Sequence, residues 1–202
     1  MLFAGSSAAG YVQAQVERER PDVVVLATST YGVAVRLVSN RVSEVLGSRA
    51  GAVAGNVERF MAKHAGHPGS TQRRLTTEVR RAGRRIVGTR PGLSVDGLVD
   101  SYEACFSTLA RAEDVQTVVL AGAGYSAEQT RLNPRWPALQ DEIHTRLRTA
   151  AVSHRFEWLV HEELLGGRDA KQPFYFADGV HTDERSQEVV AVALLPLILA
   201  KR

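Results

Sequence analysis

Apolar residues recur in two patterns along the chain, and together the patterns predict alternating strands and helices. Residues 23–27 (VVVLA) and 115–121 (VQTVVLA) are short, largely β-branched runs, typical of strands buried on both faces of a parallel sheet. Residues 156–160 (FEWLV) form a third, shorter run. Between these runs, apolar residues return every three or four positions, as on one face of a helix. The order of the patterns indicates a parallel α/β fold.

The helical periodicity predicts helices over residues 11–19, 33–47, about 55–65, about 71–83, 96–112 and 137–153, and a last helix that ends near Ile198. We expect one domain over residues 1–202, a three-layer, doubly wound parallel sheet. Residues 33–95 are longer than a simple crossover, so they are expected to form a helical insertion beside the sheet. In the longest amphipathic helix, Leu139, Ile143 and Leu147 are predicted to face the core.

Composition narrows the class of protein. The 202 residues are 44% hydrophobic and 23% charged, as in soluble globular proteins. No apolar run reaches the roughly 18 to 20 residues of a membrane span, and residues 1–4 (MLFA) lack the basic start of a secretion signal. We therefore expect a cytoplasmic protein with no membrane contact. The single Cys105 excludes an internal disulfide, and its place in a helical pattern predicts a core position.

Positive charge is concentrated in one segment. The net charge is +3, but residues 71–90 hold seven arginines against one acid, Glu78, so they contribute +6 and the rest of the chain −3. Arg73, Arg80 and Arg84 recur at offsets of seven and four and would share one helix face. That face is solvated, or is an anion site for phosphate, sulfate or carboxylate, or binds an acidic partner surface. No interleaved aromatic platform accompanies the arginines, so we expect no nucleic-acid partner.

Candidate chemistry lies near the C-terminus. Residues 174–183 (FYFADGVHTD) end an aromatic run in a turn that carries Asp178 and His181 three positions apart. An Asp that accepts a hydrogen bond from an imidazole fixes its tautomer and stabilises its protonated form, as a general base acting on a hydroxyl requires. A structural role is the alternative, in which Asp178 caps the turn and His181 begins the last helix.

This turn and the helix after it resemble the last block of the SGNH/GDSL hydrolase superfamily, where the Asp and His of a D-x-x-H motif complete a Ser-His-Asp triad. The order of strands from residue 21 onward is also similar to that family. The resemblance implies a flavodoxin-like, SGNH-like fold. It further implies a serine esterase or acyl-transfer enzyme that acts on a small ester or acylated metabolite and needs no cofactor.

The nucleophile can be assigned in two ways. In the first, residues 5–7 (GSS) match the family's Gly-Asp-Ser turn, so Ser7 is the nucleophile, and its backbone N–H and Gly5 belong to the oxyanion site. Ser6 then stands where the family has Asp. In the second, residues 5–10 match the family's second block, and the first strand with its serine is absent from this sequence. The sheet would then be completed by a partner chain or a homodimer.

The substrate pocket is expected where the strands end. Ser29, Thr30 and Tyr31 follow the first strand, and Tyr31 occupies the place of the family's oxyanion-hole Asn. Tyr125 follows the second strand, and with Tyr31 it either lines the same pocket or serves as a packing residue of these loops. The segment 122–124 (GAG) is interpreted as a tight turn rather than a dinucleotide fingerprint.

Two further functions stay open. A diverged protein without a serine nucleophile could use His181 and Asp178 for elimination or cyclisation of an anionic small molecule. The chain could also be a subunit with no chemistry of its own. Glu162 and Glu163 are expected to be solvated. We expect no bound metal, because the histidines are not grouped with carboxylates or cysteines.

Overall fold

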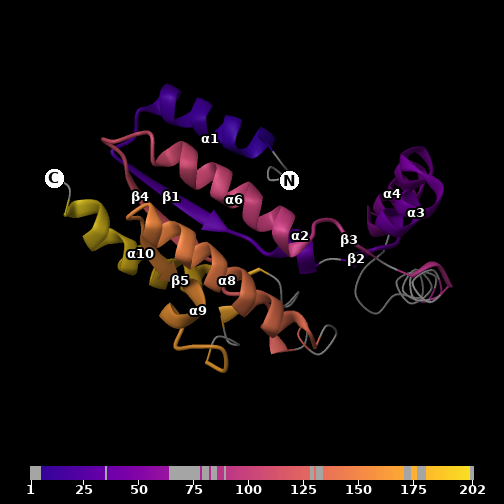
Figure 1. The fold of residues 1–202 in the computed structure, drawn as a ribbon. Coiled ribbons are helices and arrows are strands. Elements are labelled where there is room, and N and C mark those ends of the chain that lie inside the picture. Colours follow the sequence, from indigo (N-terminus) through magenta and orange to yellow (C-terminus); the bar gives the residue numbers. More distant parts are fainter. Residues whose placement is uncertain are drawn as a thin grey trace. The chain divides into compact units, whose positions relative to one another are not determined.

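The computed structural model of the chain describes residues 6–34, 36–63, 78, 82, 86–88, 90–127, 130, 134–170, 174–176 and 181–200. It divides into two compact units (Figure 1). Unit 1 comprises Met1–Tyr31 and Val95–Arg202, and unit 2 comprises Gly32–Ser94. The predicted α/β character is confirmed. The predicted insertion over 33–95 coincides almost residue for residue with unit 2, which is compact in its own right.

Unit 1 is built on a parallel sheet of three described strands. They are β1 (Val23–Thr28), β4 (Gln116–Ala121) and β5 (Glu157–Val160), and their order is β1-β4-β5. Val25 pairs with Val118, and Val119 pairs with Trp158, so β4 is hydrogen-bonded on both sides. Each strand begins and ends within one residue of its predicted range. All three carboxyl ends consequently lie at one edge of the sheet.

Three long helices form one layer against this sheet. They are α1 (Ser6–Glu19), α6 (Val95–Leu109) and α8 (Trp136–Ser153), with α6 in contact with the other two. In Figure 1 the layer lies in front of the strands. The start of α1 was predicted five residues late, because the small residues before Tyr11 were taken for a turn. In the structure Ala8 and Val12 are buried, and this packing outweighs the poor helix propensity of Gly10.

The core of unit 1 lies between the sheet and this helix layer. Thr117, Val119 and Ala121 point toward the layer and are buried, as alternate residues of a strand share one face. Phe106 of α6 lies in this core. Its ring packs edge to face against the ring of Phe156, with the two ring centroids 5.9 Å apart. Cys105 is fully buried, as predicted, and burial raises the pKa of its thiol. Burial of apolar surface between the two layers is the main stabilising contribution to unit 1.

The buried face of helix α8 is rotated slightly around the helix axis relative to the face that the sequence predicts. Ile143 and Leu147 are fully buried, as expected, but the buried stripe also includes Trp136 and Gln140, whereas Leu139 is only half-buried. Helix α8 therefore presents a polar amide to the core, which periodicity of apolar residues could not reveal.

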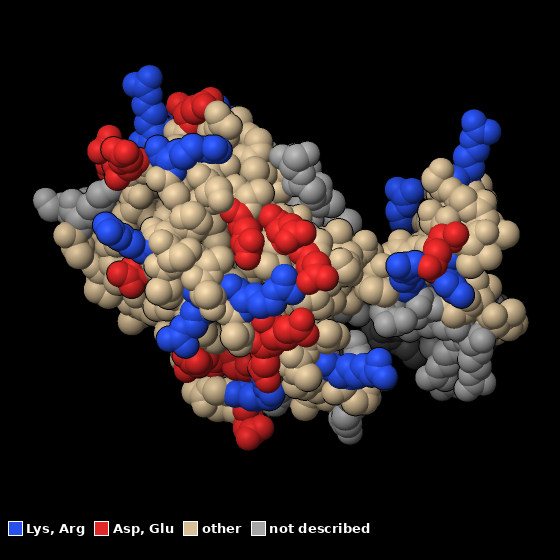
Figure 2. Space-filling view, in the orientation of Figure 1, with Lys and Arg blue, Asp and Glu red and all other residues tan. Residues whose placement is uncertain are grey.

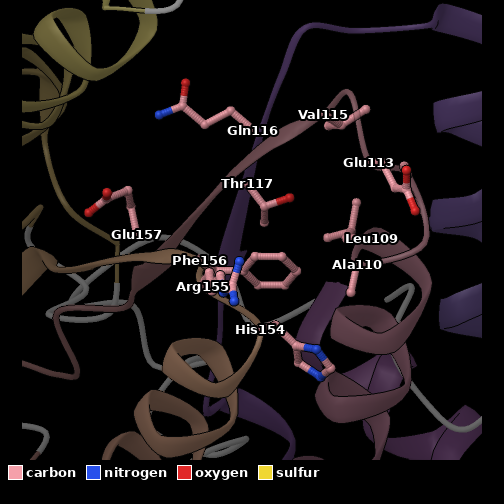
Figure 3. A pocket seen from close by; sticks show the side chains of 11 residues that line it. Leu109, Ala110, Glu113, Val115, Gln116, Thr117, His154, Arg155, Phe156 and Glu157 are labelled. Atoms are coloured by element: carbon pink, nitrogen blue, oxygen red, sulfur yellow. The ribbon is translucent and has the colours of Figure 1, made fainter.

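Two helices follow β5. Helix α9 (His161–Leu164) is a single turn, and α10 (Glu184–Leu199) is the long C-terminal helix. Asp183 caps α10 by accepting a hydrogen bond from the backbone N–H of Ser186 at 3.1 Å. Helix α10 lies on the face of the sheet opposite to α6 and α8, as Figure 3 shows from the divergent directions of Thr117 and Gln116. Of the described helices, none is long and apolar enough to cross a membrane.

Unit 2 contains a helical hairpin and a small antiparallel pair. The hairpin consists of α3 (Val38–Leu46) and α4 (Ser48–Lys63). A Cβ on Gly51 would lie 2.4 Å from the Cβ of Ser43, so only glycine permits this helix approach. Strand β2 (Arg36–Leu37) pairs with β3 (Arg90–Pro91), and Arg90 forms an ion pair with Glu44 of α3.

Two predictions for unit 2 need correction. The helix expected over 33–47 is interrupted, because α2 (Tyr31–Ala34) ends before β2 begins. The segment 85–92, expected as a plain connection, contributes β3. The helix predicted over about 71–83 lies almost entirely outside the described residues. The three arginines proposed as an anion site, Arg73, Arg80 and Arg84, lie outside them as well.

The packing of unit 1 predicts the effect of a core truncation. Phe106→Ala should lower the free energy of unfolding by about 3–5 kcal/mol, because it leaves a cavity beside Phe156. Urea denaturation measures the change. The control is Val152→Ala on the exposed side of α8, where the residue is 59% exposed and an effect within about 0.5 kcal/mol is expected. Equal effects of the two substitutions would contradict the core placement.

Candidate functional site

The carboxyl ends of the three strands meet at one edge, which is where open α/β sheets place their ligands. The loop after β1 contains Ser29 and Thr30 and leads into α2 at Tyr31, the loop after β4 runs over residues 122–126, and β5 leads directly into α9. We call these segments the carboxyl edge. Thr30 is buried, whereas Ser29 and Tyr31 are exposed.

The loop after β1 is held by a tyrosine of α6. The phenol oxygen of Tyr102 accepts a hydrogen bond from the backbone N–H of Ser29 at 2.7 Å. Tyr102 is buried, and burial raises the pKa of its phenol. No local sequence pattern indicates this hydrogen bond, because Ser29 and Tyr102 are 73 positions apart. A buried phenol thus fixes the direction in which the chain leaves the sheet.

The loop after β4 needs its glycines. A Cβ on Gly122 would lie 2.9 Å from the carbonyl oxygen of Thr28, and Gly124 has a φ of 76°. The amide of Gln140 donates a hydrogen bond to the Gly122 carbonyl at 3.4 Å. The loops after β1 and β4 are therefore packed against one another through backbone atoms.

Three tyrosines gather beyond these loops. The ring of Tyr125 packs against Trp136 with centroids 5.0 Å apart. Burial raises the pKa of the Tyr125 phenol, and the nearby Tyr31 acts in the same direction. Burial also raises the pKa of Tyr175, with Glu162 and then Tyr125 as further causes. The expectation that Tyr31 and Tyr125 lie close together agrees with this arrangement, and Tyr175 joins them.

Tyr175 also anchors the segment that carries His181. Its hydroxyl donates a hydrogen bond to the Ala123 carbonyl at 3.1 Å. Tyr175 pairs with Thr182 in an antiparallel bridge, and the backbone N–H of Phe176 donates to the carbonyl of His181 at 3.0 Å. The backbone of His181 is thus tied to the carboxyl edge, while its side chain is exposed.

The other members of the predicted triad are less fully defined. Ser7 lies in the first turn of α1. Gly5 and Asp178 lie outside the described residues, and the side chain of Ser7 is not described. The structure therefore places the backbone of His181 at the carboxyl edge and that of Ser7 at the start of α1.

Two buried polar side chains after β5 were not foreseen. The prediction that Glu162 is solvated is wrong: it is 7% exposed, with its carboxylate 3.5 Å from the Gln140 amide and 3.6 Å from the Arg168 guanidinium. His161 is also buried, and its Nε2 lies 2.6 Å from the hydroxyl of Ser186 in α10. Burial lowers the pKa of His161. The carboxyl group of Glu162 and the imidazole of His161 therefore both lie buried immediately after β5, next to the carboxyl edge.

Two other buried polar atoms at this edge have no hydrogen-bond partner in the described part of the chain. They are the hydroxyl of Thr28 and the indole N–H of Trp136. Among the described residues no three His, Cys, Asp or Glu side chains are grouped as a metal site requires. The edge consequently offers hydroxyl, phenol, indole and carboxylate groups for binding and proton transfer.

A cavity of about 340 Å³ lies away from this edge, at the amino ends of β4 and β5 (Figure 3). Leu109, Thr117, His154 and Phe156 line it, together with the exposed Glu113. It contains none of the predicted site residues. The cavity therefore has no place in the site described above.

Comparison with known proteins adds no relative: no family model, no curated protein and no solved structure matches the chain.

The buried imidazole predicts a pH dependence of stability. Since the folded protein binds a proton at His161 less readily than the unfolded chain, its contribution is complete above the ordinary imidazole pKa of 6.5 and declines as the pH falls below it. The slope from one such group is at most about 1.4 kcal/mol per pH unit. Urea denaturation at pH 7.5 and pH 5.5 should show His161→Asn less acid-sensitive than the wild type. Parallel losses in both proteins would contradict the assignment.

Proposed function

We propose that this chain is an SGNH-like serine hydrolase, an esterase or acyl-transfer enzyme for a small ester or acylated metabolite. One observation carries the proposal. The bridge between Tyr175 and Thr182 and the hydrogen bond of Tyr175 to Ala123 tie the backbone of His181 to the carboxyl edge, and Ser7 lies in the first turn of α1, the helix that precedes β1. This arrangement and the D-x-x-H motif are what the SGNH resemblance leads us to expect, including its doubly wound, three-layer sheet.

In the proposed reaction, the hydroxyl of Ser7 attacks the acyl carbonyl while the imidazole of His181 takes its proton. Asp178 orients that imidazole. The His181 imidazolium then returns the proton to the leaving alcohol, and water or a second alcohol releases the acyl group from Ser7. The backbone N–H of Ser7 and the phenol of Tyr31 are the proposed donors to the oxyanion.

The carboxyl edge suggests how a substrate is held. Tyr31, Tyr125 and Tyr175 provide flat apolar faces with polar ends, which suit a small molecule that carries both hydrocarbon and oxygen groups. Glu162, which contributes to the raised pKa of Tyr175, is the proposed acceptor of hydrogen bonds from substrate hydroxyls. The backbone contacts of Tyr102 and Gly122 keep the loops in place, so the surface needs little rearrangement on binding.

Active-site labelling tests the proposal. A fluorophosphonate probe should label the wild type, and the labelled peptide should contain Ser7. Ser7→Ala should abolish labelling and lower p-nitrophenyl acetate hydrolysis on the order of 10³-fold, and His181→Ala should do the same. The matched control is Ser6→Ala, which changes the neighbouring serine in the same turn and should retain both signals.

Two results would replace the proposal with an alternative. Activity that survives Ser7→Ala but not His181→Ala would indicate His-based elimination or cyclisation without a serine nucleophile. A well-folded wild type that is neither labelled nor active would indicate a subunit without chemistry of its own.

A further inference from the structure

The C-terminal helix α10 is apolar on two opposite sides. Ser186 and Val190, one turn apart, are buried against the rest of unit 1. Val192, Leu195 and Leu199 follow the spacing of a second stripe and are 75, 55 and 49% exposed. No charged residue occurs between Glu188 and Lys201. The part of α10 beyond Glu188 is therefore apolar all round, and such a surface belongs in the interior of an assembly rather than in contact with solvent.

The helix layer on the other face of the sheet shows what a solvated surface of this protein is like. In the orientation of Figure 2, acidic and basic side chains are interspersed over unit 1. Arg146 of α8 pairs with Asp96 at 2.7 Å, and Arg168 pairs with Asp141 at 2.7 Å. The outer stripe of α10, made of Val192, Leu195 and Leu199, contains no such ion pairs. The contrast indicates that this stripe is covered in the functional protein.

The sheet face that carries α10 is only partly covered. Residues paired across strands share a face, so Val23, Val25 and Ala27 of β1 lie on the same face as Val118 of β4. Val118 is fully buried, whereas Val25 is 38% exposed and Ala27 is exposed. Parallel sheets ordinarily have both faces covered. Helix α10 thus covers the side of β4 and leaves the side of β1 open.

We propose that two copies of this chain form a dimer in which α10 of each copy packs on the open face of β1 in the other. The two sheets then face each other across a layer made of both α10 helices. The inner side of each α10 remains on its own sheet, and its outer stripe covers Val25 and Ala27 of the partner copy.

A second copy is the occupant that fits because each chain has both halves of the contact. One chain offers an apolar helix face without a sheet and an apolar sheet face without a helix. Under a two-fold axis the same contact is made twice, which is the defining property of an isologous interface. From Val192 to Leu199 the outer stripe carries no charged side chain, and neither does β1, so the apolar parts of the two halves meet without like charges; Glu188 lies one turn before the stripe. The proposal is independent of the hydrolase assignment.

Analytical ultracentrifugation of the full chain tests the proposal. The wild type should sediment as a species near 44 kDa, twice the 22.0 kDa of one chain. Leu195→Glu should weaken the dimer at least about tenfold, because it buries a charge in the interface. Val152→Glu, which alters an exposed valine of α8 instead, should leave the dimer unchanged. Circular dichroism melting checks that both variants are folded.

Cross-linking with a short bis-maleimide tests the geometry. A mixture of Val25→Cys chains with Leu195→Cys chains should give a covalent dimer, whereas Leu195→Cys alone should give none, since the two outer stripes face sheets and not each other. A wild type that remains monomeric would overturn the proposal. A dimer that resists Leu195→Glu, cross-linking of Leu195→Cys to itself, or co-sedimentation of the chain with phosphatidylglycerol vesicles would also overturn it.

Discussion

The pairing of β4 on both sides is the constraint on which the rest of unit 1 depends. Because Val118 and Val119 are hydrogen-bonded to β1 and β5, the loops that follow the three strands are brought to one edge although they are far apart in sequence. The close approach of Gly122 to the Thr28 carbonyl fixes how tightly the first two loops pack. Tyr102 and Tyr175 then attach further segments to those loops through hydrogen bonds to backbone atoms. The edge is therefore shaped mainly by backbone geometry, and its side chains act on a rigid support.

The strands and long helices could be predicted because their signal is local. The β-branched runs of β1 and β4 and the apolar repeat around Ile143 and Leu147 each specify an element within one short window. Elements that depend on distant partners could not be predicted in this way. Strand β2 exists only because Arg36 and Leu37 meet residues more than fifty positions later. Two residues give no periodicity, and so the break in the helix expected over 33–47 had no local cause to detect.

The candidate site was predictable to a lesser degree, for the same reason. The positions of Tyr31 and Tyr125 after successive strands were enough to bring them together, since strand order alone places them at one edge. The burial of Glu162 depends on Gln140 from α8 and Arg168 from the next loop, and no pattern around Glu162 indicates either partner. His161 and Ser186 are 25 positions apart, and the hydropathy of the residues around each gives no sign that the two side chains meet. Buried polar contacts of this kind are set by tertiary packing and leave little trace in the order of residues.

The position of Cys105 has a practical consequence. The chain has one thiol, and it is fully buried in the middle of α6, between the helix layer and the sheet. An alkylating reagent can reach its sulfur only when that layer separates from the strands, so the rate of modification at low denaturant reports on opening of the interior. The thiol of Cys105 is thus a built-in chemical reporter of cooperative unfolding, because its burial protects it from reagents that reach only the surface.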